Sequence, residues 1–456
     1  MATTTSPPIV SIQAPKDVSI EQIEAELSQM WQGYNQEDGQ AATRATTFSL
    51  LVFEPDPSQQ LLSALGFYSG PLDGISGPRT TAAVEAAQKA YEMEVTGQIT
   101  PELKQKLEAE FTRAKQEGKL SSAAASFAPD AQAAGLADEI AATSPCRIIT
   151  LCVTPGEDEG VEAQVSAYCP LQKQKKQSNL ICCEYITLRG TAEALERVGG
   201  IISALTISEL PKFLWWKATP EPNYGLFKRL VKECDRTIFD SSSFNSPEAD
   251  LLQVGKLLEE KKPLADLNWG RLAAWQELTA EAFDPPERRS AILEVDRVTV
   301  DYEKGNLSQA IVYLGWLGSR LQWNPVSFER EQQDGGYDIA RVKFTSANQK
   351  EIEAELAGVP VADAGEILGD LMSLRLSSTN LEADCCTVLC SETTGCMRME
   401  AGGGAQSCRI QQVTPLFDQK TDTLLGQELQ RWGSDVLYEE SMTLAYQILS
   451  LANQKN

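Results

Sequence analysis

Short apolar runs of strand length alternate with longer amphipathic runs of helical length along most of this chain. The first strand-like runs after residue 145 are CRIITLCV (146–153), AQVSAYCPL (163–171) and LICCEYITLR (180–189). Helical patterns follow at 191–205, 224–234, 248–262 and 267–282, with the run KFLWWKA (212–218) between the first two. This alternation predicts the α/β class, with helices layered on a mixed sheet.

The same alternation continues to the C-terminus. It predicts strands near 295–302, 339–346, 350–356, 370–377 and 383–390, and helices at 307–321 and 421–452. A helix at 19–34 and a strand at 48–53 precede these elements. We therefore expect residues 1–54 to belong to the core, followed after an insertion by a first α/β core domain (144–294) and a second one (295–456).

The inserted segment has a different pattern, with three helical stretches separated by glycine turns between Ser58 and Phe111. Thr100 and Pro101 supply an N-cap and a first-turn proline. The stretch LGFYSGPLDGISGPRTTAAVEAAQ (65–88) resembles the peptidoglycan-binding type of three-helix module, in which the Asp73–Gly74 pair would shape the turn before the middle helix. We predict such a module at 55–115 and a linker of small residues at 116–143.

The composition limits the classes of function. Lys and Arg number 40 against 64 Asp and Glu, so nucleic acid and anionic membrane surfaces should be repelled. The chain has no histidine, which excludes Ser-His-Asp, Cys-His and HExxH chemistry and favours a binding role. There is no CxxC and no GxxxxGK[ST] motif, so we predict neither a metal site nor a cofactor.

The expected location is the cytoplasm. The N-terminal stretch MATTTSPPIVSIQAPKD has no apolar core of a signal peptide, and no uncharged apolar run approaches the roughly 18 to 20 residues that span a bilayer. In that compartment the 11 cysteines should be mostly reduced. Without an export signal, the inserted module is expected to act in docking or as a spacer rather than in binding cell-wall glycan.

Two tryptophan-bearing segments are candidates for a protein contact. In ELPKFLWWKATPEP (209–222), Trp215 and Trp216 face opposite sides of the predicted strand, next to Lys217. In DLNWGRLAAWQ (266–276), Trp269 and Trp275 lie about 240° apart on a continuous helix, beside Arg271, so we expect at least one of them to face away from the core. Either these rings are ordinary core, as in a strand covered on both faces, or some of them anchor a partner.

Cys390 and Cys396 flank a short polar loop that contains a glycine. One interpretation is two unrelated thiols. The other is a reversible dithiol switch, since the spacing can bring the Cα atoms within the roughly 4.4 to 6.8 Å that a disulfide requires.

Five motifs in order resemble the glucose-6-phosphate dehydrogenase assembly protein family, OpcA, in its cyanobacterial form. They are ATRATTFSLLVFE (42–54), SPCRIITL (144–151), ELPKFLWWKATPEP (209–222), CDRTIFDSSSF (234–244) and DLNWGRLAAWQ (266–276). The resemblance implies a non-catalytic partner that supports the active oligomer of glucose-6-phosphate dehydrogenase and activates it allosterically. From the residue types in these motifs we place Trp215, Trp216, Lys217, Trp269 and Arg271 near that contact. Because photosynthetic cells change redox state between light and dark, the resemblance also favours redox control through Cys390 and Cys396, with thioredoxin as a candidate partner.

Two other classes remain open from the residues. A sugar-phosphate enzyme could use Asp235, Arg236 and Asp240, although two carboxylates near an arginine more often form a salt-bridge group. A cell-envelope protein could bind peptidoglycan through residues 58–111.

Overall fold

A computed structural model describes residues 9–453, apart from 38–41, 45–46, 56, 69–77, 118–145, 155–157, 171–179, 245, 333–336, 362–366, 368, 381, 393–395, 403–409, 416–420 and 432. The chain divides into two compact units. The first comprises Met1–Phe239, Lys262–Leu264 and Leu425–Arg431, and the second comprises Asp240–Lys261, Ala265–Leu424 and Trp432–Asn456. The predicted domain boundary at 294 and 295 falls inside the second unit.

Among the described residues, nine strands form a first sheet. In sheet order these are β1 (Ile9–Val18), β5 (Glu162–Pro170), β6 (Leu180–Gly190), β4 (Arg147–Val153), β3 (Ser49–Glu54), β7 (Lys212–Trp216), β8 (Arg236–Phe239) and β9 (Leu264–Asp266), and β2 (Ala42–Arg44) pairs with β6. The pairs β6–β4, β4–β3, β3–β7 and β7–β8 are parallel, whereas β5 and β1 add antiparallel strands at one edge. The predicted mixed sheet is confirmed.

The parallel part of this sheet is doubly wound. Counted along the chain, its strands β3, β4, β6, β7 and β8 lie in the spatial order 3-2-1-4-5. The order reverses between β3 and β7, which is the switch point where ligands bind in open α/β sheets, outside the carboxyl ends of the strands.

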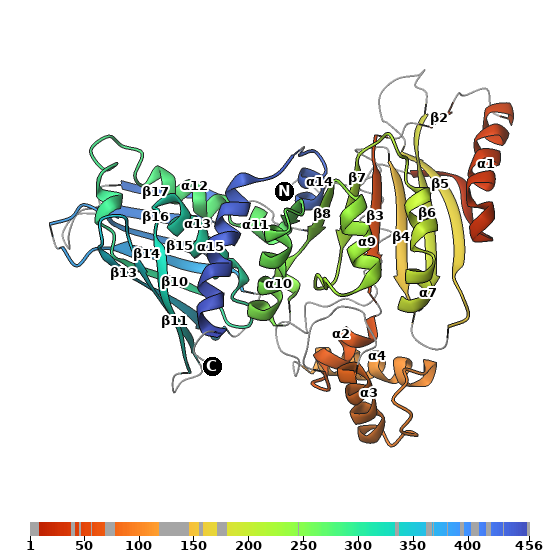
Figure 1. Cartoon of the computed structure of the whole chain (residues 1–456), viewed down its shortest axis with the longest axis horizontal. Coiled ribbons are helices and arrows are strands. Elements are labelled where there is room, and N and C mark those ends of the chain that lie inside the picture. Colours follow the sequence, from red (N-terminus) through yellow and green to blue (C-terminus); the bar gives the residue numbers. More distant parts are fainter. Residues whose placement is uncertain are drawn as a thin grey trace. The chain divides into compact units, whose positions relative to one another are not determined.

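Helices cover the sheet of the first unit, as Figure 1 shows. They are α1 (Ile23–Glu37), which follows the 3₁₀ turn Ile20–Gln22, then α7 (Ala192–Arg197), α8 (Gly199–Leu205) and α9 (Gly225–Glu233). The backbone N–H of Ala194 donates to Thr191 Oγ1 at 3.2 Å and so caps α7. The single helix predicted at 191–205 is interrupted at Val198, just before the glycine pair 199–200, whose low helix propensity explains the break.

The inserted module has a small core of its own. It contains α2 (Pro57–Ala64), α3 (Pro78–Ala90) and α4 (Pro101–Gln116), which confirms the three predicted helices. Thr100 Oγ1 accepts from Leu103 N at 3.2 Å, as expected of an N-cap. The core consists of Leu61, Leu62, Tyr68, Ala83, Val84, Ala87, Leu103, Leu107 and Phe111. Asp73, Gly74 and almost all of the predicted linker at 116–143 lie outside the described residues.

A second, eight-stranded sheet belongs to the second unit. Its order among the described residues is β11 (Asn324–Gln332), β12 (Asp338–Thr345), β13 (Glu351–Val359), β10 (Arg297–Glu303), β14 (Leu371–Ser377), β15 (Cys386–Glu392), β16 (Cys396–Gly402) and β17 (Ile410–Pro415). All neighbours are antiparallel except β10 and β13. Burial alternates along β10, so one face is apolar and the other carries polar side chains.

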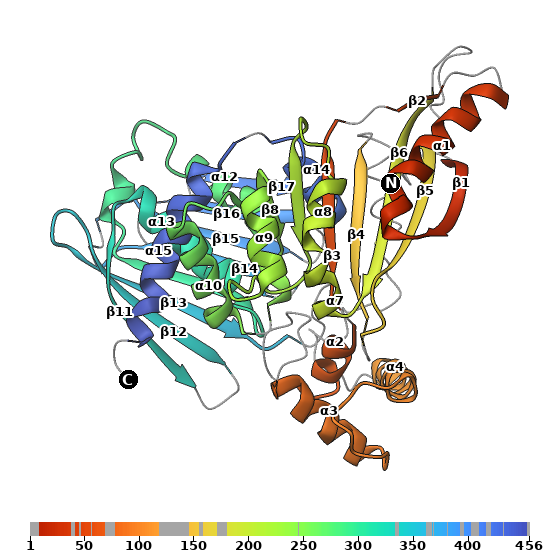
Figure 2. The same cartoon turned by 45° about the vertical axis from the view of Figure 1, so that its right-hand side comes forward.

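The helices of the second unit are α10 (Pro247–Glu259), α11 (Leu267–Arg271), α12 (Ala273–Glu281), α13 (Ser308–Arg320), α14 (Thr421–Glu428) and α15 (Val436–Asn453), with 3₁₀ turns at Ser241–Ser243 and Ala291–Glu294; the last half of α14 is assigned to the first unit. In both views α13 and α15 lie against the second sheet (Figure 2). Two predicted helices are wrong in extent. The one at 267–282 breaks at Leu272, and the one at 421–452 is divided ahead of Val436, where Gly433 has φ +95°.

Candidate functional site

Trp216 lies in the core of the first unit. Its ring stacks on Phe53 of the neighbouring strand β3, with centroids 3.7 Å apart and planes 7° apart, and also packs against Tyr224 and Phe227. Its Nε1 donates to the carbonyl of Thr219 at 3.2 Å. The side chain is 0% exposed, so its aromatic surface and its one polar atom are both satisfied inside the unit.

Trp215 lies on the other face of β7, and Lys217 directly follows this strand. Trp215 is also buried, at 4% exposure. Lys217 Nζ lies 4.9 Å from the centroid of the Trp215 ring and donates to both carboxylate oxygens of Glu54, at 2.7 and 2.8 Å. A quarter of the Lys217 side chain is exposed. Of these three predicted contact residues, Lys217 has the most surface available to a partner.

The Glu54–Lys217 pair lies at the switch point of the first sheet. Glu54 is the last residue of β3 and Lys217 follows β7, and these are the two strands between which the order reverses. In nucleotide-binding sheets of this order, a glycine turn after the first strand presents backbone N–H groups to the phosphates. Here that strand is followed by Pro55 and Pro57, which have no N–H to present.

Trp269 is fixed by polar and aromatic contacts within the second unit. Its Nε1 donates to Asp435 Oδ2 at 3.0 Å, and its ring lies 5.8 Å from that of Tyr438. Trp269 and Trp275 are 7% and 3% exposed. The expectation that at least one of them faces away from the core is wrong, because the helix is interrupted at Leu272 and the 240° separation does not apply.

Arg271 forms the centre of a buried polar cluster. Its Nη1 and Nη2 donate to Asp240 Oδ1 and Oδ2 at 2.7 and 2.8 Å. Weaker bonds of 3.3 Å reach Ser242, Asn268 and Thr421. Burial would raise the pKa of Asp240, but the charge and hydrogen bonds of Arg271 hold it below its usual value.

Asp266 is a residue of this cluster that the sequence analysis missed. Its Oδ1 accepts from the backbone N–H groups of Ser241 and Asn268, at 3.0 and 2.9 Å, so it caps α11. Its Oδ2 is buried without a hydrogen-bond partner among the described residues. Burial, followed by the negative charge of Asp240, raises the pKa of Asp266 to about 7. The only signal in the sequence was an Asp immediately before an apolar helical run.

The structure does not assemble the residues of the enzymatic alternative into one site. Arg236 pairs with Glu428 at 2.8 Å, and both side chains are less than a tenth exposed. Asp235 Oδ2 accepts from the backbone N–H of Lys212 at 2.9 Å. Asp240 binds Arg271, as described above. Each residue therefore has its own structural partner, as in the salt-bridge interpretation.

The register of the β15–β16 hairpin places Cys390 opposite Arg398, and Cys396 opposite Glu392. The two cysteines are thus diagonal neighbours, a relation that separates residues by about 7–8 Å in an antiparallel pair. A disulfide needs Cα atoms within roughly 4.4–6.8 Å, so closing this one would require the hairpin end to shift. The side chain of Cys396 lies outside the described residues.

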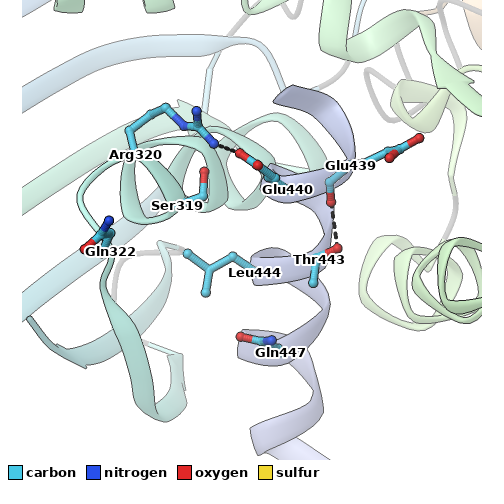
Figure 3. Close-up of a pocket in the computed structure, with 8 residues that line it drawn as sticks. All are labelled: Ser319, Arg320, Gln322, Glu439, Glu440, Thr443, Leu444 and Gln447. Carbon is cyan, nitrogen blue, oxygen red and sulfur yellow. Dashed lines mark hydrogen bonds and ion pairs between the residues drawn. The ribbon is translucent and has the colours of Figure 1, made fainter. Parts of the chain in front are cut away.

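A shallow pocket in the second unit lies between the end of α13 and the outer face of α15 (Figure 3). Its volume is about 630 Å³, and its lining consists of Ser319, Arg320, Gln322, Glu439, Glu440, Thr443, Leu444 and Gln447. An ion pair between Arg320 and Glu440 crosses it. None of the residues singled out from the sequence line this pocket.

Two further kinds of site are absent from the described residues. No group of three or more Cys, Asp or Glu side chains there is arranged to hold a metal ion. No described helix is long and apolar enough to cross a bilayer.

The fold and these residues define a doubly wound α/β protein with an internal ion pair at its switch point, joined to a second unit with an antiparallel-rich sheet. Two family models match consecutive parts of the chain, described as the glucose-6-phosphate dehydrogenase subunit N-terminal domain (137–256) and C-terminal domain (262–442). A third, described as "Putative peptidoglycan binding domain", matches 58–107. The chain belongs to the glucose-6-phosphate dehydrogenase assembly protein family, OpcA.

Curated relatives match over nearly the whole length. A protein of a Synechocystis strain, named "Putative OxPP cycle protein OpcA", is 60% identical over 99% of this chain and 96% of its own. A Nostoc punctiforme protein of the same name is 58% identical over 98% of this chain and 96% of its own.

Solved structures show a more distant likeness. An aldose-aldose oxidoreductase from Caulobacter crescentus is 13% identical over 59% of this chain and 83% of its own, with a TM-score of 0.36. An NAD-binding oxidoreductase from Klebsiella pneumoniae is 6% identical over the same shares, with a TM-score of 0.36.

Proposed function

We propose that this chain is a non-catalytic assembly factor and activator of glucose-6-phosphate dehydrogenase, acting in the cytoplasm at the entry to the oxidative pentose phosphate pathway. The observation that carries the proposal is the pair of consecutive family models over 137–256 and 262–442, together with 60% identity to a relative over 99% of the chain. The acidic composition agrees with a protein partner rather than nucleic acid or membrane.

The chemistry of the first unit supports the non-catalytic part of this proposal. Its switch point carries the Glu54–Lys217 ion pair and a Pro-containing turn where a nucleotide-binding sheet has a glycine turn. The chain also has no histidine to act as a general acid or base. A protein of this kind can raise another enzyme's activity by binding its active conformation more tightly than its inactive one.

The partner-contact residues are part of the proposal. Lys217 is partly exposed and can reach a partner directly. Trp215, Trp216, Trp269 and Arg271 are less than a tenth exposed, which favours the interpretation of these four as packing residues that shape the surface around them. Contact through any of them would require local rearrangement.

Redox control through Cys390 and Cys396, with thioredoxin as the reducing partner, is also part of the proposal. The two residues are separated in the chain by the loop of the β15–β16 hairpin. Because they are diagonal neighbours, forming a disulfide between them would distort the hairpin. A distorted hairpin end would change any contact surface that it contributes to.

The experiment compares glucose-6-phosphate dehydrogenase from Synechocystis alone and with increasing amounts of the pure full-length chain, in reducing and in oxidising buffer. Activity and oligomer size are measured on the same samples. We expect higher activity and a larger or more stable dehydrogenase oligomer when the chain is present, and no turnover when the chain is incubated with sugar phosphates alone. Identical kinetics and oligomer size with and without the chain in both buffers would contradict the proposal.

The model that matches 58–107 is described as a peptidoglycan binding domain, so peptidoglycan binding is the second function to test. Co-sedimentation of the full chain with purified peptidoglycan tests it directly. Retention in the pellet that free glycan fragments compete away would support it, whereas a chain that stays in the supernatant would leave the module a role in docking or spacing.

A further inference from the structure

Two buried thiols lie directly opposite each other on neighbouring parallel strands of the first unit. In the β4–β6 ladder Arg147 pairs with Glu184, so the residues one position earlier, Cys146 and Cys183, form the next opposed pair. The backbone N–H of Glu184 donates to the carbonyl of Cys146 at 3.3 Å, which extends the ladder to this position. Cys146 and Cys183 are 1% and 0% exposed, and a hydrogen bond joins their thiols.

This arrangement meets the distance condition for a disulfide. Neighbouring strands of a sheet lie about 4.7–4.9 Å apart, inside the roughly 4.4–6.8 Å range of Cα separations in disulfides. The diagonal separation of about 7–8 Å expected for Cys390 and Cys396 is outside it. On backbone geometry alone, the first unit therefore holds the better-placed pair.

The register at this position is fixed by the adjacent residues. Arg147 Nε donates to Glu184 Oε2 at 2.8 Å, and both side chains are 2% exposed. Arg147 also donates to the carbonyl of Leu205 at 2.6 Å, and Trp31 Nε1 donates to Glu184 Oε1 at 2.6 Å. A slip of either strand would break this buried ion pair, so the two thiols are held opposite each other.

We propose that Cys146 and Cys183 are a redox-active pair that forms a disulfide across β4 and β6. Hydrogen peroxide is a suitable oxidant because it is small and uncharged. One thiolate attacks a peroxide oxygen, the O–O bond breaks, and a sulfenic acid and water result. The second thiol then attacks that sulfur, the S–S bond forms and a second water leaves, so two thiols and one peroxide give one disulfide and two waters. A dithiol reductant reverses the reaction by exchange.

The environment makes the pair slow to react while reduced. The hydrogen bond from Cys183, together with burial, raises the pKa of Cys146 well above its usual value, and the thiolate is the reactive form. Oxidation should therefore need local opening of the sheet at this end of the two strands, or prolonged exposure to peroxide. Such a pair would respond to sustained oxidation rather than to rapid changes.

The test is peptide mapping of the full-length chain. The protein is treated with hydrogen peroxide, unfolded in acid, alkylated and digested with trypsin. Cleavage after Arg147, Lys176 and Arg189 puts Cys146 in one peptide and Cys183 in another, which also contains Cys182. Four variants are compared with the wild type: C146S, C183S, C182S and C152S. Cys152 is the matched control, because it lies on the same strand opposite Arg189 instead of a cysteine.

We expect a linked peptide in the wild type, in C182S and in C152S, and none in C146S or C183S. It should disappear on treatment with dithiothreitol. Oxidation should also raise the melting temperature of the wild type but not of C183S, because the cross-link restricts the unfolded chain. Oxidation of the half-buried Cys152 in the same sample shows how far the peroxide treatment has progressed. If Cys146 and Cys183 are still alkylated separately after prolonged exposure to peroxide that has oxidised Cys152 completely, or if the link involves Cys182 or Cys152, the proposal is wrong.

Discussion

Arg271 and Asp240 form a two-pronged ion pair, in which both terminal nitrogens of the guanidinium donate to the two carboxylate oxygens at 2.7 and 2.8 Å. Arg271 is 1% exposed on its side chain and Asp240 is 16% exposed. The resemblance to the family suggested Arg271 as a contact residue, whereas this geometry gives it a structural role. The two roles predict different outcomes for the same variant.

Substitution R271M should lower the free energy of unfolding by about 3–5 kcal/mol, because it leaves the buried Asp240 carboxylate without its counter-charge. R271K should cost less, since it keeps the charge and loses the second hydrogen bond. Urea unfolding followed by tryptophan fluorescence measures both. The matched control is R341A, which removes a 44% exposed arginine paired with Glu331 and Glu355 and should change stability by about 1 kcal/mol or less.

A contact role for Arg271 would give the opposite pattern. R271M would then unfold at the wild-type urea concentration and still fail to activate the dehydrogenase. That combination would show that Asp240 and Arg271 contribute little to the fold.

Substitution D266N should make stability less dependent on pH. The folded pKa of Asp266, about 7, is above its unfolded value of 3.8, so the folded state keeps a proton that the unfolded state has already lost. Its contribution is therefore fully present below pH 3.8, falls between pH 3.8 and about 7, and stays low above that. The charged or titratable groups that interact with Asp266 are Asp240, Arg271 and Tyr438.

The measurement is urea unfolding of wild type and D266N at several pH values from 5 to 8. The carbonyl oxygen of the introduced asparagine can still accept from Ser241 N and Asn268 N, as the Asp266 carboxylate does. We expect D266N to be more stable than the wild type at pH 8, by about 2–4 kcal/mol, and the difference to shrink towards pH 5. A difference that is constant across this range would show that Asp266 titrates as an ordinary carboxylate in the folded protein.

Substitution G315A should push apart helices α13 and α15 of the second unit. A Cβ at Gly315 in α13 would lie 2.2 Å from the carbonyl oxygen of Ser441 in α15, a backbone atom that cannot turn away. We expect a loss of about 1–3 kcal/mol in the free energy of unfolding, as for other overpacked cores. The control is G426A in α14, where the added Cβ meets nothing within 4 Å and should stabilise the helix by up to about 1 kcal/mol. Equal stability of the two variants would contradict the close contact between α13 and α15.

Substitution K217A tests the most exposed of the predicted contact residues. The fold should lose about 1 kcal/mol or less, because the Glu54–Lys217 pair is partly open to solvent. If Lys217 contacts the dehydrogenase, the concentration of the chain that gives half-maximal activation should rise about tenfold, which corresponds to about 1.4 kcal/mol. K212A, at the other end of β7, is the control. Unchanged activation by K217A would remove Lys217 from the interface.

Elements with strong local patterns could be predicted from the sequence, and those that depend on register or on distant partners could not. The alternating run at 339–346 and the helical run at 307–321 match β12 and α13 to within a residue or two. The short strand β8 was missed because it has only four residues, begins with the charged Arg236 and lies between Asp235 and Asp240. Strands β11, β16 and β17 were also missed, since their polar and glycine-rich surroundings read as loops.

The contacts of the candidate site could likewise not be predicted where they depend on residues distant in the sequence. Burial of Trp216 was one of two open alternatives, and the choice depended on Phe53, which is far away in the sequence. The partner of Arg271 lies 31 residues away, and the thiol opposite Cys146 lies 37 residues away, without any spacing motif. Such pairs are produced by the strand order, which no local pattern specifies.

The inserted module lies in a connection whose length the sheet does not restrict. It is carried on the connection between β3 and β4, two adjacent parallel strands that an ordinary crossover of a dozen or more residues would suffice to join. The residues from Pro55 to Pro145 are therefore far more than the sheet needs, and their length places no constraint on the order of the strands. A lineage could lose, replace or duplicate the inserted module, and β3 and β4 would keep the same register and the same hydrogen bonds.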